Sequence, residues 1–269
     1  MPKLQPLLGC RIKIDRAKKH FGDLELAIKA YFERKGCSVI AEYDPETKQE
    51  LHRFRMNECI PMEWGTLIGD CVHNLRSSLD FLAHDLVING NGTPTDQTAF
   101  PIGGDITTFN NDVGRRLKGA SPFAIGLVKR LKPYGGTDGC EMLVQMHRLN
   151  ILDKHRILLP VFASHQQTYW SPITAAMKEM GFKVEGNWPA WALKPKGGIS
   201  PLEDGTVLGS YGRGPADVDH SEFKFVIDVT FGEGQVFERE PVVTTLAQLI
   251  DLTERLIGVF ALRVFKTIF

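Results

Sequence analysis

Apolar residues recur at alternating steps of four and three along the segment from Pro61 to Asn89. This spacing predicts one long helix whose buried seam consists of Ile68, Val72, Leu75, Leu79, Leu82 and Leu86. At about 100° per residue, a second set lies roughly opposite the seam. We call this set the polar row, and its members are Asp70, His73, Arg76, Ser77, Asp80 and His84.

The polar row has an unusual composition, because it contains neither Lys nor Glu. His, Arg, Asp and Ser are the groups that move protons and bind anions or metals, so the row is a candidate lining for a polar cleft. The same residues would also suit an internal network of hydrogen bonds and ion pairs that joins two helices. Both interpretations remain open at this point.

The periodicity elsewhere predicts helices over most of the first 160 residues. Ala17 to Tyr31 form a first amphipathic helix, followed by a hairpin whose strands flank a turn at Asp44-Pro45. Asp105 is expected to cap a short helix that ends at Lys118, and Ser121-Pro122 to begin another that ends at Leu131. Asp138 and Glu141 have capping-box spacing before a central helix that carries the segment 142–159.

Strand signals dominate from Val161 to Phe237, with regular alternation from Phe223 to Phe231. A helix over about 244–266 closes the chain. The predicted fold is therefore α+β: a helical, bundle-like core joined to a mostly antiparallel sheet. We expect a single domain over 1–269, with a helical part (about 1–160) and a strand-rich part (about 161–240).

The composition excludes a strong global field, since 32 Lys and Arg balance 32 Asp and Glu. Any contact with nucleic acid must therefore be local. No apolar run approaches membrane-spanning length, and we expect no membrane partner. The five Cys residues are scattered without paired metal-type spacing, which favours reduced thiols and a cytoplasmic location.

A second polar cluster lies in the sequence HRLNILDKHR, from His147 to Arg156. An aspartate close to the apolar side of a helix needs a partner, and the polar row can supply one. We therefore expect the two clusters to meet: Asp80 or His73 should lie within about 3.2 Å of one residue of a second set. That set is Asn150, Asp153, Lys154 and Arg156.

The segments IGDCVHNLRSSLDFLAHDL and LNILDKHR resemble the paired motifs of a group of uncharacterised bacterial and phage proteins of similar length. That resemblance covers most of the chain and implies no activity. The chain also resembles the HEPN superfamily of helical bundles, whose ribonucleases place an Arg and a His four to six residues apart on one helix. Arg148 and His155, with six residues between them, match this spacing, whereas Arg76 and His84, with seven, do not.

The HEPN resemblance implies a metal-independent RNA endonuclease that acts as a homodimer and binds RNA or a nucleotide without a cofactor. A His would exchange protons with the 2′-hydroxyl or the leaving oxygen, and an Arg would stabilise charge on the phosphate. The candidate catalytic residues are His73, Arg76, Asp80, Arg148, Asn150, Asp153, Lys154 and His155.

Two other functions remain open. His73, Asp80 and His84, with Asp70 or Asp153, are ligand types for a metal-dependent hydrolase, although His73 and His84 lie too far apart on one helix to share an ion. A non-catalytic module for nucleotides or anions is the third alternative. It would use Arg76, Lys154 and Arg156 for phosphate and the tryptophans Trp64, Trp170, Trp188 and Trp191 for stacking.

Overall fold

The computed structural model describes residues 5–155, 158, 160–165, 201–212, 226–232 and 234–269. Its backbone contacts divide the chain into two compact units. Unit 1 comprises residues 1–27, 61–159 and 234–269, and unit 2 comprises residues 28–60 and 160–233. Each unit therefore combines segments that are distant in the sequence, and residues from the first sixty positions contribute to both.

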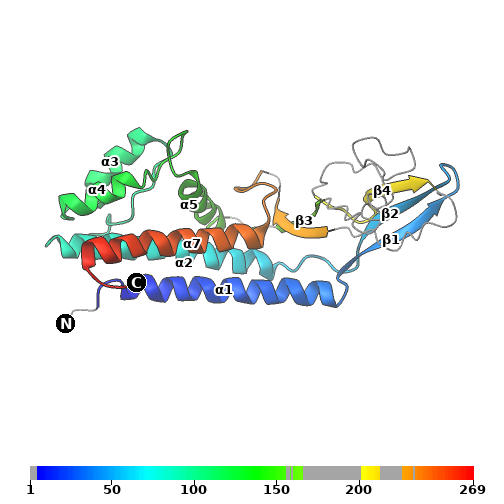
Figure 1. The fold of residues 1–269 in the computed structure, drawn as a ribbon, viewed down its shortest axis with the longest axis horizontal. Coiled ribbons are helices and arrows are strands. Elements are labelled where there is room, and N and C mark those ends of the chain that lie inside the picture. The colour runs from blue at the N-terminus through cyan, green and yellow to red at the C-terminus, as the bar shows by residue number, and fades with distance from the viewer. Residues whose placement is uncertain (1–4, 156–157, 159, 166–200, 213–225, 233) are drawn as a thin grey trace, which may run out of the picture. The chain divides into compact units, whose positions relative to one another are not determined.

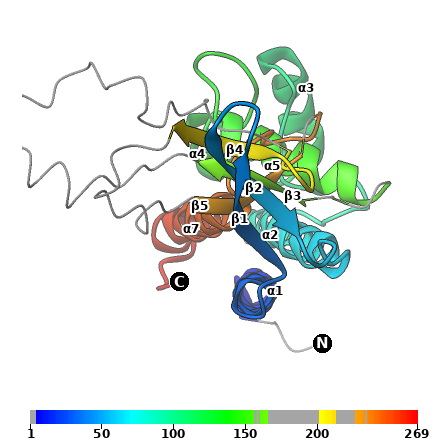
Figure 2. The same cartoon turned by 90° about the vertical axis from the view of Figure 1, so that its right-hand side faces the viewer.

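Unit 1 consists of helices. They are most of α1 (Leu8–Glu33), then α2 (Glu63–Asn89), α3 (Ile106–Arg116), α4 (Pro122–Arg130), α5 (Glu141–Asp153), α7 (Val242–Phe260) and the π-helical turn η1 (Ala261–Phe265). Helices α1, α2 and α7 run lengthwise beside one another (Figure 1) and are seen nearly end-on in Figure 2. Helix α2 is central to this arrangement, because it packs against both α5 and α7.

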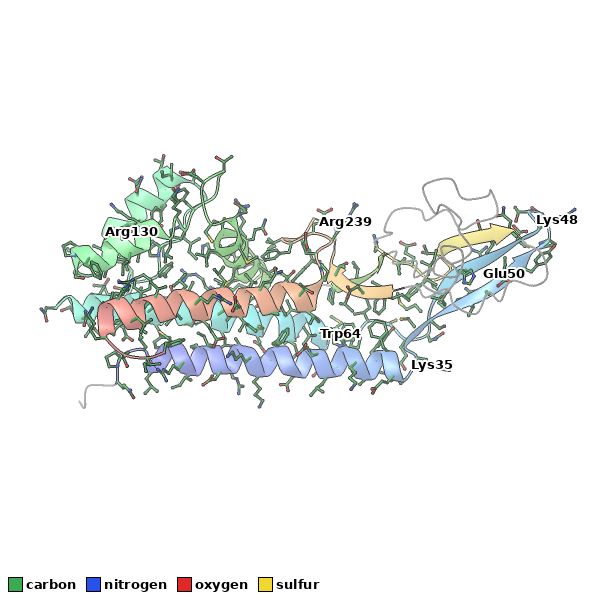
Figure 3. The ribbon with its side chains drawn as sticks, viewed as in Figure 1. Lys35, Lys48, Glu50, Trp64, Arg130 and Arg239 are labelled. Carbon is green, nitrogen blue, oxygen red and sulfur yellow. The ribbon has the colours of Figure 1, made fainter. Side chains whose placement is uncertain are left out.

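The predicted seam of α2 is confirmed, since Ile68, Val72, Leu75, Leu79, Leu82 and Leu86 are each at most 1% exposed. Trp64, in the first turn of α2, is also buried at 1% exposure (Figure 3). A fully buried aromatic side chain contributes mainly to packing. Trp64 therefore does not supply the stacking surface considered for a nucleotide-binding module.

The two short helices begin where their capping residues predicted. Asp105 Oδ1 accepts a hydrogen bond from Thr108 N at 2.9 Å, and Ser121 Oγ accepts one from Ala124 N at 3.2 Å. These bonds satisfy backbone donors that the first turn of a helix leaves free. The cap assignments for α3 and α4 are confirmed.

For α5, the start of the helix at Glu141 fits the prediction, but the predicted capping residue and the predicted end were wrong. Asp138 does not cap this helix: its carboxylate contacts Lys132 Nζ at 3.1 Å, and the N-cap residue, Cys140, makes no side-chain cap bond. The helix ends at Asp153, and His155 N bonds to Leu152 O in the following turn. Because β3 begins at Pro160, the chain must leave the helix earlier than the apolar pattern indicated.

Unit 2 contains the described strands. They are β1 (Cys37–Asp44), β2 (Gln49–Met56), β3 (Pro160–His165), β4 (Val207–Gly212) and β5 (Val226–Phe231). The strands form one antiparallel sheet of order β1-β2-β4 and one antiparallel pair, β3-β5. The predicted hairpin is confirmed, with Asp44 binding Glu46 N and Thr47 Oγ1 in its turn.

Buried aromatic residues form the core of unit 2. Phe162 of β3 lies 5.5 Å from Tyr31 and 5.7 Å from Phe54, measured between ring centroids. All three side chains are fully buried. Contacts of this geometry add to the free energy that ring burial provides. They join the end of α1, strand β2 and strand β3 within one core.

The α+β fold with antiparallel sheets is thus confirmed. The C-terminal helix lies close to its predicted bounds, although its last turn is π-helical. Strands expected around residues 166–200 and the first part of the predicted strand at Phe223 lie outside the described residues, as do Trp170, Trp188 and Trp191. No helix in the part of the chain that the structure describes is long and apolar enough to cross a membrane.

The Asp105 cap provides a test of the fold. Replacing Asp105 with Ala removes the side-chain acceptor for Thr108 N, so the free energy of unfolding should fall. Asp105→Asn retains an acceptor oxygen and should lose less. Urea denaturation of both variants measures the difference, and equal losses would contradict the capping role.

Candidate acid–base site between α2 and α5

A buried guanidinium joins three separate segments of unit 1. The Arg76 side chain is 7% exposed. Its Nη1 donates to Asp80 Oδ1 at 2.7 Å, its Nη2 donates to Phe100 O at 2.9 Å, and its Nε donates to His147 Nδ1 at 3.2 Å. We call these four residues the Arg76 clasp. It ties α2 to the segment before α3 and to α5.

The clasp holds both polar backbone groups of Phe100. Phe100 N donates to Asp80 Oδ1 at 2.9 Å, while its carbonyl accepts from Arg76. Phe100 itself is fully buried, so its backbone groups need partners away from water. Arg76 and Asp80 therefore have an evident scaffold role, with the guanidinium directed into the protein.

His147 is neutral in this environment. Burial, with the nearby charges of Arg76, Arg116 and Lys154, lowers the pKa of His147 to about 4. Its Nδ1 accepts the Arg76 hydrogen bond, so the ring proton lies on Nε2. His147 is therefore a hydrogen-bond donor at neutral pH that carries no charge of its own.

A second pair of contacts lies one turn along both helices. His73 Nδ1 is 3.2 Å from Asn150 Oδ1, and His73 Nε2 is 3.5 Å from Ser77 Oγ. His73 is exposed, whereas Asn150 is 3% exposed. A buried amide thus fixes the orientation of an imidazole that water can reach. We call His73, Ser77, Asn150 and Asp153 the His73 cluster.

Asp153 completes this cluster because α2 has a glycine opposite it. A Cβ at Gly69 would lie 1.9 Å from Asp153 Oδ1, so only a residue without a side chain lets the carboxylate come this close to α2. Burial and the charge of Asp70 raise the pKa of Asp153, while His73 opposes them. The Asp153 carboxylate is therefore positioned to balance a positive charge on His73.

Helix α1 contributes further polar contacts to the same side of α2. Lys13 Nζ lies 3.3 Å from Asn74 Oδ1, and Asn74 Nδ2 donates to the carbonyl of Asp70 at 2.7 Å. His20 Nδ1 lies 4.0 Å from Asp70 Oδ2, which is an ion-pair distance but too long for a hydrogen bond. Asp70 therefore has polar neighbours on α1 and α2, while its own side chain stays 51% exposed.

The expected meeting of the two polar clusters is confirmed by the contact between His73 and Asn150. The polar row nevertheless does not form one face towards a cleft. Arg76 is buried and His73 exposed, because the clasp turns the guanidinium towards Phe100 and α5. Asp80 binds Arg76 and Phe100 and does not reach the second cluster.

The Arg148 and His155 pair expected from the HEPN spacing does not lie on one helix. Helix α5 ends at Asp153, so His155 follows it in a turn and is exposed. Arg148 faces another side, where it lies 3.8 Å from Glu141 and lines a cavity of about 450 Å³ with Gln145 and residues 234–238 and 240. These two residues therefore lack the expected arrangement.

The ligands considered for a metal are also not gathered. Among the residues that the structure describes, no three His, Cys, Asp or Glu side chains are placed to hold one ion. His73, Asp80 and His84 therefore form no donor set together. Arg156, considered for phosphate binding, lies outside the described residues.

Three features of the site were not assigned from the sequence. They are the clasp on the Phe100 backbone, the proximity of Arg116 to His147, and the space that Gly69 leaves for Asp153. The first two depend on contacts between distant segments. The third had a local signal, since a glycine in the middle of a helix reduces its stability unless something approaches closely.

Comparison of the chain with family models, with curated proteins and with solved structures finds no match. The function must therefore be inferred from the geometry of the site itself.

If the Arg76 clasp is a scaffold, replacing Arg76 should destabilise the protein much more than replacing the exposed Arg255. Arg76→Gln leaves Asp80 and the Phe100 carbonyl without their charged partner, and should lower the free energy of unfolding by about 3 to 5 kcal/mol. The control is Arg255→Gln, which removes an exposed pair with Asp251 and should lower the free energy of unfolding far less. Thermal unfolding measures both, and similar losses would contradict the scaffold role.

Because the pKa of His147 is lowered in the folded protein, the free energy of unfolding should depend on pH. An unfolded His binds its proton near pH 6.5, whereas folded His147 does so only near pH 4. Between these values the unfolded state holds more protons, so stability should fall as pH decreases from about 6.5 to 4. The contribution is at most about 1.4 kcal/mol per pH unit.

Urea denaturation at several pH values across this window tests the prediction. In His147→Gln, which retains an acceptor for Arg76, the stability should depend less on pH than in the unmodified protein. His155→Gln provides the control and should show the unmodified slope, because His155 is exposed. An unchanged slope in His147→Gln would contradict the assignment.

Proposed function

We propose that this protein cleaves RNA without a metal ion, with His73 as the base that removes the 2′-hydroxyl proton. The observation that carries the proposal is the exposed imidazole of His73, with Nδ1 at 3.2 Å from the buried Asn150 Oδ1. A base needs solvent or substrate access and a fixed orientation. His73 has both, whereas Arg76 and Asp80 are occupied by the clasp.

The contact with Asn150 supports a defined tautomer. With Asn150 Oδ1 as the acceptor, the His73 proton lies on Nδ1, and the lone pair of Nε2 is free to accept a proton. Asp153, held against Gly69, would stabilise the imidazolium that then forms. This is the same division of roles as in other sites where a second group orients a catalytic His.

The cationic groups that act on His147 support a phosphate-containing substrate. Arg116 and Lys154 lie close enough to His147 for their charges to lower its pKa. In the reaction, Nε2 of His73 takes the 2′-hydroxyl proton and the 2′ oxygen attacks phosphorus. The bond to the 5′ oxygen breaks, and that oxygen is protonated by solvent. The products are a 2′,3′-cyclic phosphate and a 5′-hydroxyl, and cations would stabilise the charge on phosphorus oxygens.

A second candidate uses Ser77 as a nucleophile. Ser77 Oγ lies 3.5 Å from His73 Nε2, which gives the order Ser, His and Asn found when a base activates a hydroxyl. Ser77 lies within α2, where backbone N–H groups are used by the helix and offer no oxyanion hole. This geometry therefore favours RNA cleavage over acyl transfer.

Three expectations from the sequence belong with this proposal: an RNA or nucleotide ligand, a homodimer, and a bacterial or phage protein acting in the cytoplasm. The homodimer was implied by the HEPN resemblance, whose Arg and His pair the structure does not place together on one helix. Light scattering of the purified protein would decide its oligomeric state.

The test is cleavage of a labelled single-stranded RNA in the presence of chelator. We expect activity that persists with chelator, yields cyclic phosphate ends and falls at least about 100-fold in His73→Gln. DNA of the same sequence should not react, because it lacks the 2′-hydroxyl. Ser77→Ala should retain most activity, whereas the Ser77 alternative requires its loss.

His84→Gln is the matched control, since it changes a His of the same helix outside the His73 cluster. Thermal unfolding of His73→Gln should confirm that the variant is folded. Activity abolished by chelator, or retained fully in His73→Gln, would contradict the proposal.

A further inference from the structure

We propose that the cavity of about 450 Å³ lined by α5 and the segment 234–240 binds a guanine base. We call it the α5 cavity. The inference goes beyond the proposed RNA cleavage and does not rest on it. Gln145 and Arg148 line the cavity, whereas His147 and Asn150 make contacts between α5 and α2. The α5 cavity and the His73 cluster therefore lie on different sides of the same helix.

One wall of the α5 cavity supplies hydrogen-bond donors. Gln145 and Arg148 are three residues apart on α5, so their side chains project from the same face. The Arg148 side chain is 56% exposed, and its contact with Glu141 is 3.8 Å, which is longer than a hydrogen bond. The guanidinium is thus available to a ligand, and its parallel N–H groups match a pair of neighbouring acceptors.

The other wall, from the segment before α7, supplies acceptors. Glu238 Oε2 accepts from Gly234 N at 3.2 Å, and Glu238 Oε1 lies 3.7 Å from Nε of Arg239, which Figure 3 labels. Glu238 is therefore engaged in its own segment. Glu240 is exposed, and its carboxylate forms no hydrogen bond or ion pair with a described residue. The Glu240 carboxylate is the acceptor left for a ligand.

The segment 234–240 has a fixed and unusual backbone. Gly234, Phe237 and Arg239 have φ angles of 70°, 61° and 65°, which lie in the left-handed region. Non-glycine residues seldom adopt this conformation, and it persists where surrounding contacts hold it. Here those contacts are the Glu238 carboxylate on Gly234 N and the bond from Glu240 N to Phe237 O at 2.9 Å. A wall whose shape is set before binding loses little conformational freedom when a ligand binds.

The size and lining of the α5 cavity suit a nucleobase. Its volume lies within the range of about 300 to 1,000 Å³ that is usual for small-molecule sites. Val236 and Phe237 contribute apolar side chains to the lining, on which a planar base can bury part of its surface. A free amino acid carries charges that would also match the walls, but it is much smaller and would leave most of the volume unfilled.

Guanine is the base whose edges match both walls. Its N1–H and N2–H groups lie side by side and fit the two oxygens of a carboxylate such as that of Glu240. Its O6 and N7 atoms are neighbouring acceptors that fit a guanidinium such as that of Arg148. Adenine, cytosine and uracil do not present both pairs. The chemistry of the two walls therefore favours guanine over the other bases.

The experiment is isothermal titration calorimetry of the whole protein at pH 7 with guanosine, inosine and adenosine 5′-monophosphate. The three ligands carry the same sugar and phosphate, so differences between them report on the base. We expect saturable binding of the guanosine nucleotide. The inosine nucleotide, which lacks the N2 amino group, should bind about tenfold more weakly, and the adenosine nucleotide more weakly still.

Variants assign the two walls. Arg148→Gln and Glu240→Gln should each weaken binding of guanosine monophosphate about tenfold. Glu240→Gln should affect inosine monophosphate less, because that ligand lacks the amino group that Glu240 would bind. Arg255→Gln and Glu63→Gln are the controls, since they change exposed charged residues outside the α5 cavity, and should leave binding unchanged. Thermal unfolding checks that each variant is folded.

Equal affinity for the guanosine and adenosine nucleotides, no binding of either, or unchanged binding in both cavity variants would overturn the assignment. Guanosine monophosphate binding without RNA cleavage supports the assignment and contradicts only the proposed function. Uncleavable 2′-O-methyl RNA then identifies the source of the base. Competition by a guanine-containing RNA, but not by a guanine-free RNA, indicates an RNA strand, and no competition by either indicates a free nucleotide.

Discussion

The buried guanidinium of Arg76 is the interaction on which the helical unit depends. It carries a positive charge into an interior where an unpaired charge would be very unfavourable, and three hydrogen bonds make that burial possible. Each bond reaches a different partner: the same helix, the backbone before α3, and α5. The hydrogen bond to His147 ties α5 to α2 one turn from the contact between His73 and Asn150.

This dependence explains why neighbouring residues of α2 have different roles. Arg76 is buried, and Asp80, although its side chain is 36% exposed, binds Arg76 and the Phe100 backbone through Oδ1. His73 and Ser77, which alternate with them along the helix, stay accessible to solvent. Arg76 and Asp80 help to position His73 and Ser77, because a catalytic side chain is oriented best when the residues around it are fixed by their own hydrogen bonds. Removing the Arg76 clasp would therefore disturb the geometry of the His73 cluster, although none of the cluster residues is changed.

Much of the fold could be predicted from local signals in the sequence. The α2 seam, the caps at Asp105 and Ser121, and the hairpin turn at Asp44 each depend on residues within a few positions of one another. The end of α5 was mispredicted, because the helix ends at Asp153 although the apolar pattern of the sequence continues beyond it. Tertiary pairing of Pro160 with Phe231 outweighed the local helical preference.

The candidate site was predictable in part for the same reason. Complementary charges indicated that the polar row and the HRLNILDKHR cluster would meet, and His73 does contact Asn150. The sequence did not show which of these residues would be buried. Burial depends on hydrogen bonds to the backbone of Phe100, and backbone groups leave no pattern in the sequence. The effect of the Arg116 charge on His147 was hidden too, since it depends on the packing of α3.

The strand order β1-β2-β4 also determines when this sheet can form during synthesis of the chain. The β1-β2 hairpin can form as soon as residue 56 has been synthesised, but β2 pairs with residues up to Gly212. Until then, one edge of β2 is open to pairing with other chains. Arg53 and Arg55 lie on that strand, and charged side chains on an exposed edge disfavour intermolecular pairing. During synthesis these arginines would protect the nascent hairpin from aggregation, before they bind Gly205 and Asp204 in the finished sheet.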